Sequence, residues 1–173
     1  GRYSDNKNQI RIIEIFSLIL KAFPNSKLKL VGTGEEYKKH LQKKVSSLKL
    51  DSYVEFLSSN TDVKEVLEEA ALFMFPSKHE GFGIAVVEAQ AMEVPCLVSD
   101  SVPKEVDFGL CKFISLSKSN EEWATEAIKV LNNNHFLKLN RKKLKMVDLN
   151  DYVRKFNDIY GGNYFESCNI DFS

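Results

Sequence analysis

The sequence predicts an α/β fold in which helices cover both faces of a parallel sheet. Three observations support this prediction. Short apolar strand patterns alternate with helical patterns along the chain, two of these strands run directly into glycine turns that precede helices, and no internal repeat interrupts the alternation. Such alternation is typical of a parallel sheet, because the crossover between two parallel strands is usually a helix.

The helical and strand patterns are placed by their periods. Apolar residues between positions 8 and 23 recur at intervals of three and four, which predicts a helix with one buried face. Strands are predicted at 27–31, 53–56, 72–75, 96–99 and 112–115, with helices at 35–48, 63–70, 83–92 and 119–131. Ser119 and Glu122 have the spacing of a capping box at the start of the last of these helices. Further helices are expected at 136–146 and 150–160.

The length of the chain indicates one main domain. With 173 residues and 43% apolar content, the chain can bury one sizeable core. We assign residues 1–160 to this domain and expect the irregular segment 161–173 to form a disordered tail. The chain opens on a glycine with no strand pattern before it, so we expect a first strand upstream of residue 1.

Composition excludes several classes of protein. Lys plus Arg equals Asp plus Glu at 24 each, so no global field favours nucleic acid or an anionic membrane. Cys96, Cys111 and Cys168 lack the spacing of a disulfide framework or of a zinc site. No apolar run approaches the roughly 18 residues that a membrane span needs, and no signal peptide is visible. We therefore expect a cytoplasmic protein without a bound metal.

The first glycine turn is the segment GTGEEY at residues 32–37. A dinucleotide fingerprint would need glycine where Tyr37 stands, and Glu35 and Glu36 would repel a pyrophosphate at the start of the helix. We interpret Gly32 and Gly34 as a tight turn at which a ligand could approach the backbone. A dinucleotide site is the less favoured alternative.

The second glycine turn carries more chemistry. Gly81 and Gly83 lack Cβ atoms where a predicted helix presents its first amides, and this arrangement predicts a cradle for an anion. Glu80 and Glu88 stand on either side of the cradle, and carboxylates can accept hydrogen bonds from neighbouring sugar hydroxyls. The ordinary alternatives are a capping carboxylate for Glu80 and a solvated helix face for Glu88.

The segment EGFGIAVVEA at residues 80–89 resembles the E-x7-E signature of retaining GT-B glycosyltransferases, in the group called family 4. Three other segments match this family in order and spacing: GR with KN at residues 1–2 and 7–8, LVGTG at 30–34, and FPS at 75–77. The stretch SDSVPKE at 99–105 is similar to the subgroup that builds bacterial exopolysaccharide and capsule. One departure is Glu93, which stands where the family usually has glycine.

The resemblance implies the Rossmann-like, doubly wound C-terminal half of a GT-B enzyme, with the acceptor domain upstream. It implies a hexose donor carried by UDP or GDP, with neither cofactor nor metal required. Arg2 and Lys7 would neutralise the leaving diphosphate, and Glu80 would contact the hexose, so these three are the expected catalytic residues. The expected donor-binding residues are Gly32, Gly34, Ser77, Gly81, Phe82, Gly83, Ile84 and Glu88.

The resemblance also implies partners and leaves alternatives open. The acceptor would be a glycan or a lipid-linked glycan bound through the missing domain, with no nucleic acid involved, so the isolated chain is expected to be inactive. The whole enzyme would be cytoplasmic, or peripheral at the inner face of the membrane. The alternatives are a noncatalytic nucleotide-sugar-binding module and a related sugar-nucleotide epimerase.

Overall fold

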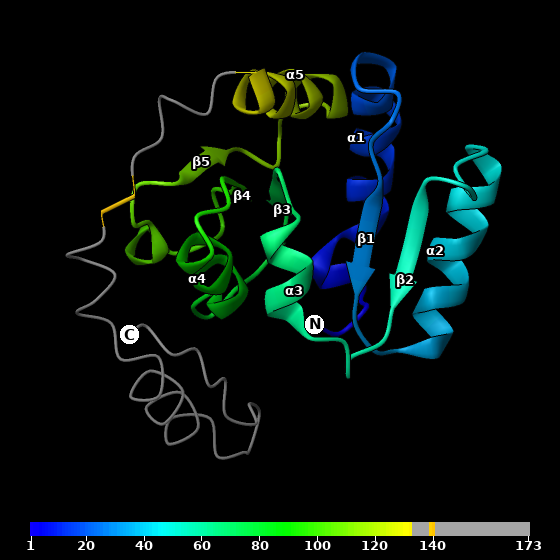
Figure 1. Cartoon of the computed structure of the whole chain (residues 1–173), viewed down its shortest axis with the longest axis horizontal. Helices are drawn as coiled ribbons and strands as arrows, with labels where there is room; N and C mark the ends of the chain where they lie inside the picture. Colours follow the sequence, from blue (N-terminus) through cyan, green and yellow to red (C-terminus); the bar gives the residue numbers. More distant parts are fainter. Residues whose placement is uncertain (133–138, 141–173) are drawn as a thin grey trace. The chain divides into compact units, whose positions relative to one another are not determined.

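The computed structural model describes residues 1–132 and 139–140 (Figure 1). Its strands are β1 Leu28–Val31, β2 Val54–Leu57, β3 Phe73–Phe75, β4 Cys96–Ser99 and β5 Cys111–Ile114. Its helices are α1 Gln9–Ala22, α2 Glu35–Ser47, α3 Val63–Glu68, α4 Ile84–Ala91 and α5 Asn120–Asn132, with short 3-10 helices η1 Asp5–Lys7 and η2 Lys104–Val106. The helices predicted at 136–146 and 150–160 and the tail at 161–173 lie outside the described residues, apart from positions 139 and 140.

The predicted parallel α/β architecture is confirmed, because every ladder between these strands is parallel. The strands form two sheets, β1-β2 and β3-β4-β5. β4 is central in the second sheet and is buried along its whole length, which explains why its first three residues are all apolar. The chain start adds a short extended segment beside β1, where Arg2 bridges Thr33 in parallel and the Tyr3 amide donates to the Thr33 carbonyl at 2.7 Å.

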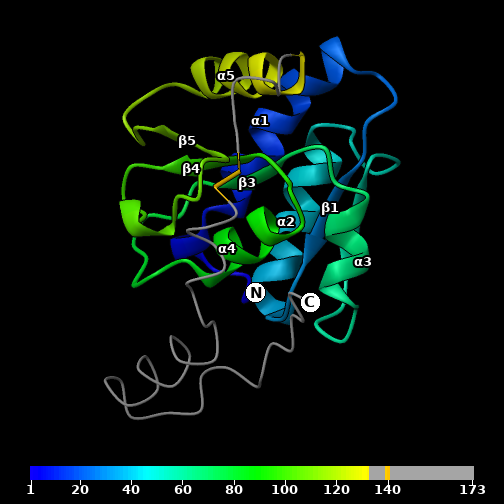
Figure 2. The same cartoon turned by 60° about the vertical axis from the view of Figure 1, so that its left-hand side comes forward.

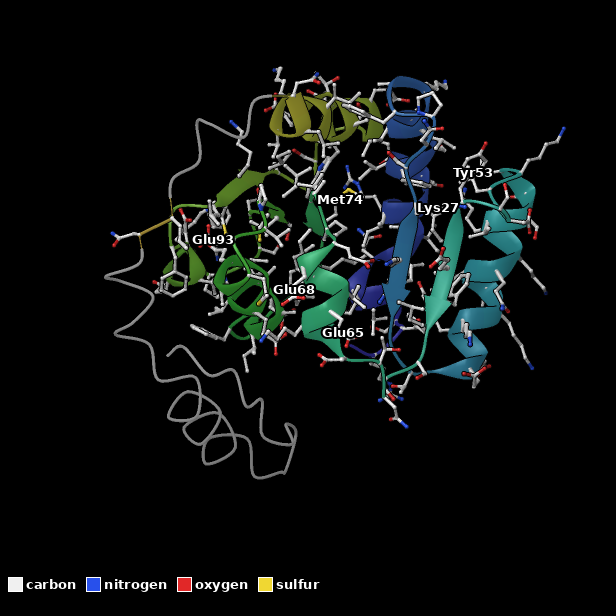
Figure 3. The ribbon with its side chains drawn as sticks, viewed as in Figure 1. Lys27, Tyr53, Glu65, Glu68, Met74 and Glu93 are labelled. Atoms are coloured by element: carbon white, nitrogen blue, oxygen red, sulfur yellow. The ribbon has the colours of Figure 1, made fainter. Side chains whose placement is uncertain are left out.

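Helix α1 supplies side chains to two hydrophobic clusters within the described residues. Ile13 and Phe16 pack with residues of β1 and α2, while Ile15 and Ile19 pack with β4 and α5. Met74 on β3 is partly buried against both clusters (Figure 3). Both ribbon views place α1 beside α5 (Figure 2). Within residues 1–132 and 139–140, no helix is long and apolar enough to cross a bilayer.

The predicted capping box at the start of α5 is present. The Glu122 amide donates to Ser119 Oγ at 3.2 Å, and the Ser119 amide donates to Glu122 Oε2 at 2.8 Å. Each residue therefore satisfies a backbone donor of the other, as this motif requires.

Helices α2 and α4 end in the same way, although neither has a glycine at its end. Past α4, the Glu93 amide donates to the Gln90 carbonyl and the Val94 amide to the Ala89 carbonyl, both at 2.9 Å. This is a Schellman motif, which needs a left-handed residue, and Glu93 has φ 61°. Lys49 takes the same position past α2, with φ 57°. A glutamate thus takes the left-handed position that glycine usually takes in this motif, and the helix still stops at Ala91.

Glycine at position 49 should stabilise the fold. Lys49 is exposed. A left-handed residue with a Cβ costs the folded state about 1 kcal/mol, and glycine avoids this cost. Glycine also gives the unfolded chain more conformational freedom, which offsets part of the gain in stability. We expect Lys49→Gly to raise the free energy of unfolding by about 0.5 kcal/mol in urea denaturation. Lys49→Ala is the control, because it removes the charge and keeps the Cβ. An equal gain from alanine would show that backbone strain is not the cause.

Candidate functional site

The centre of the candidate site is an ion pair between η1 and the loop that follows β3. Lys7 Nζ lies 2.5 Å from Glu80 Oε2, and the two side chains are 28% and 15% exposed. Ser77 is fully buried and its Oγ donates to the same carboxylate oxygen at 3.2 Å. Ser99 Oγ, at the end of β4, donates to the Ser77 carbonyl at 2.6 Å and so ties this loop to the sheet. Three predicted site residues that are up to 73 positions apart are thereby brought together.

Asn6 joins this loop to η1 through hydrogen bonds. Asn6 Nδ2 donates to the His79 carbonyl at 2.9 Å, and the His79 amide donates to Asn6 Oδ1 at 3.0 Å. The Lys78 amide also donates to the Asn6 carbonyl at 2.8 Å. Asn8 Nδ2 adds a bond to the Pro76 carbonyl at 3.2 Å. These bonds fix the backbone on either side of Lys7 relative to the loop that carries Glu80.

Asn8 also explains how the chain turns from η1 into α1. It has φ 57° and is at once the last cap of η1 and the first cap of α1. Asparagine enters the left-handed region more readily than most side chains do. Lys7 therefore lies at a sharp turn between two helical segments, and its side chain lies over the Phe75 ring, with Nζ 5.0 Å from the ring centroid.

The second glycine turn has the geometry that the sequence predicts for it. Gly83 has φ 93° and is the N-cap of α4, and no side chain makes a cap bond at this helix start. A Cβ on Gly83 would lie 3.3 Å from Val102 Cγ1 and 3.5 Å from Glu80 Cγ. Glu80 is therefore not the capping carboxylate of this helix; its carboxylate accepts from Lys7 and Ser77. The first amides of α4 are free of a side-chain cap, as an anion site requires.

Glu88 lies on the second turn of α4 and is half-buried, so it is not on a fully solvated face. The second glutamate of the E-x7-E segment thus lies on the helix whose N-cap is Gly83.

The first glycine turn is explained by the chain packing on itself. A Cβ on Gly32 would lie 2.0 Å from the Gly1 carbonyl oxygen, and one on Gly34, at φ 112°, would lie 3.2 Å from the Tyr3 carbonyl oxygen. Tyr3 is buried here and its hydroxyl donates to the Leu30 carbonyl at 2.7 Å. Burial raises the pKa of Tyr3 to about 12. The space beside Gly32 is thus filled by the protein, which disfavours a pyrophosphate at this turn.

Behind the site, Gln90 joins α4 to the segment that leads into β5. Its side chain is fully buried. Nε2 donates to the Val86 carbonyl at 3.1 Å and to the Val106 carbonyl at 2.7 Å. Oε1 accepts from the Phe108 amide at 2.8 Å and from the Leu110 amide at 3.3 Å. This one amide satisfies four backbone groups and holds α4, with its N-terminus and Glu88, in place.

Among the remaining predicted residues, Arg2 pairs with Thr33 in the first glycine turn, and its carbonyl accepts from Gln9 Nε2 at 3.2 Å. Arg2 and Gly81 are exposed, while Phe82 and Ile84 are half-buried. In the part of the chain that the structure describes, no three His, Cys, Asp or Glu side chains are grouped to hold a metal ion. Sequence reasoning missed Asn6 and Gln90, since each acts through backbone groups that are distant along the chain.

Comparison with known proteins places the chain in a family. The family model described as "Glycosyl transferases group 1" matches residues 1–146. The chain belongs to this family. Among its relatives is EpsF of Bacillus subtilis (strain 168), which is 30% identical over 126 residues, covering 72% of this chain and 33% of EpsF. The chain thus spans about a third of the length of that relative.

For two further similar proteins, the name or the crystal structure identifies a ligand. The GDP-mannose:cellobiosyl-diphosphopolyprenol alpha-mannosyltransferase of Xanthomonas oryzae pv. oryzae (strain PXO99A) is 32% identical over 108 residues, covering 60% of this chain and 28% of that protein. The crystal structure of Anabaena HepE in complex with UDP superposes with a TM-score of 0.73 at 18% identity, covering 93% of this chain and 47% of that one. The superposition confirms the predicted Rossmann-like fold of the glycosyltransferase family.

Proposed function

We propose that this chain is the donor-binding domain of a retaining glycosyltransferase that moves a hexose from a UDP- or GDP-sugar to a glycan or a lipid-linked glycan. The observation that carries the proposal is the Lys7–Glu80 pair beside a helix start that no side chain caps. A cation and free backbone amides suit a diphosphate, whereas a carboxylate suits sugar hydroxyls. The site therefore has partners for both ends of a nucleotide sugar.

The residues divide the work of this reaction. Lys7 and Arg2 would contact the diphosphate and stabilise the negative charge that develops as it leaves. Gly81, Gly83 and the amides at the start of α4 would face the phosphates, and Glu88 would accept from the ribose hydroxyls. Glu80 would contact the transferred hexose. We propose that fixed protein cations do this without a divalent metal.

Two relatives support the class of donor that we propose. One solved relative holds UDP, and another relative is named for a GDP-mannose donor and a lipid-linked acceptor. Both agree with a nucleotide-sugar donor, and together they leave the base open between uracil and guanine. Polysaccharide biosynthesis is the role we infer for the whole enzyme.

The experiment is a calorimetric titration of the 173-residue chain with UDP, GDP and NAD, each with and without EDTA. We expect UDP or GDP to bind, with no change on adding EDTA, because Lys7 and the α4 amides supply the charge that a metal would otherwise supply. The affinity should be modest, since a ligand site between two domains is only half present in one of them.

Each competing interpretation has its own result in this titration. Binding of NAD in preference to both nucleoside diphosphates would favour a dinucleotide domain. Loss of UDP and GDP binding on adding EDTA would contradict the metal-independent site. Binding of none of the three would contradict the proposed function itself.

A further inference from the structure

In the candidate site, the two groups expected to bind opposite ends of the donor bind each other. Lys7 Nζ lies 2.5 Å from Glu80 Oε2, and each side chain is largely buried. A phosphate oxygen and a carboxylate oxygen compete for an ammonium group, because both are charged acceptors of the same donors. Glu80 and the diphosphate therefore compete for the same cation.

We propose that donor binding at this site is an exchange, in which the diphosphate displaces Glu80 from Lys7 and the released carboxylate turns to the hexose. This inference rests on the proposed function and adds an order of preference among ligands. A nucleotide sugar offers Glu80 new hydroxyl donors when the pair opens. A nucleoside diphosphate opens the same pair and offers Glu80 none, so it binds less well and is released more easily after transfer.

The surroundings allow the side chains to exchange while the backbone stays still. Asn6 holds η1 to the loop through bonds of 2.8 to 3.0 Å with Lys78 and His79. Ser77 Oγ lies 3.2 Å from Glu80 Oε2 and is a donor that the carboxylate can keep when its bond to Lys7 opens. The Phe75 ring under Lys7 gives the lysine a second favourable contact, 5.0 Å from Nζ to the ring centroid.

The test is Glu80→Gln, which keeps the shape of the side chain and its contact with Ser77 while removing the charge that pairs with Lys7. We expect the variant to bind UDP or GDP roughly 3 to 10 fold more tightly than the wild-type chain, because a partly exposed ion pair no longer has to open. Calorimetry with whichever of the two nucleotides binds the wild type gives the measurement. Glu80→Ala is the second variant, and the same gain is expected from it.

A double-mutant cycle separates exchange from simple repulsion between Glu80 and phosphate. In a Lys7→Met background, Glu80→Gln should give no gain, because the pair is already gone; a gain of equal size there would overturn the exchange. Asp5→Asn is the charge control, since Asp5 lies on the same η1 and pairs with exposed Lys78 at 2.8 Å. We expect its affinity to stay within about twofold of the wild type, as is usual for an exposed pair.

Two negative results would have different meanings. If the wild-type chain binds neither UDP nor GDP, the proposed function fails. If the wild type binds one of them and neither Glu80 variant binds it more tightly, the donor site stands and the exchange alone is wrong.

Discussion

Gln90→Leu should lower the free energy of unfolding by about 3 to 5 kcal/mol, the largest effect we expect from one substitution in this chain. The Gln90 amide is fully buried and bonds four backbone groups. Leucine has a similar volume and would leave the amides of Phe108 and Leu110 buried without this acceptor. Each buried donor that loses its partner costs about 1 to 3 kcal/mol.

Urea denaturation of wild type and variant measures this loss. Gln42→Leu is the matched control, because it makes the same change on an exposed position of α2. We expect the control to shift stability by less than about 0.5 kcal/mol, as surface substitutions usually do. If both variants lose the same free energy of unfolding, the loss comes from replacing any helical glutamine by leucine and not from the hydrogen bonds that Gln90 makes.

The burial of Gln90 could have been read from the sequence, but its partners could not. Gln90 follows Val86 by four positions and Val87 by three, so it shares their buried helix face. Three of its four partners lie 16 to 20 positions further on in an irregular segment around η2, and the fourth is the Val86 carbonyl in the same helix. Periodicity carries no information about which loop packs against a helix face. The same limit hid Asn6, whose bonds reach 73 positions along the chain.

Elements with a strong period were predicted well. β4 was placed at 96–99, as observed, and α1 and α5 differ from their predicted bounds by a residue or two at each end. The capping box predicted for Ser119 is confirmed in its geometry. The division of the strands into two sheets was not predicted, because a local pattern fixes that a strand is parallel and buried without fixing its neighbours.

The site was predicted from a resemblance more than from physics. A glycine turn before a helix is enough to predict an anion cradle, and Gly83 has the left-handed φ that such a turn needs. That Lys7 meets Glu80 could not be derived from spacing, since 73 positions separate them. The first glycine turn shows the opposite case, because Gly32 is required by the nearby Gly1 carbonyl whether or not a ligand comes near it. Its role in donor binding stays a prediction.

Glu88→Gln should weaken the binding of UDP or GDP by about 10 to 100 fold, because a charged hydrogen bond is worth about 1.5 to 3 kcal/mol. Glu88 is half-buried on the second turn of α4, the helix whose N-cap is Gly83. Glutamine keeps the shape of the side chain and replaces one acceptor by a donor. It therefore cannot accept from both ribose hydroxyls as the carboxylate can.

Two measurements on this variant separate a ligand contact from a structural one: a thermal melt without ligand and a calorimetric titration with nucleotide. If Glu88 serves the nucleotide, the affinity falls and the melting temperature hardly moves. If its carboxylate serves the fold, the melting temperature falls by several degrees, since about 1 kcal/mol corresponds to roughly 2 to 4 °C in a chain of this size.

Glu36→Gln is the control for this variant. Glu36 is exposed in the first turn of α2, so it repeats the change at a helix start where the Gly1 carbonyl fills the space beside Gly32 and disfavours a pyrophosphate. Its affinity for UDP and GDP should match that of the wild type. A loss at Glu36 with none at Glu88 would move the nucleotide to the first glycine turn. Lost stability with unchanged affinity in Glu88→Gln would instead contradict the ribose role, because the loss of a carboxylate that binds ribose must weaken nucleotide binding.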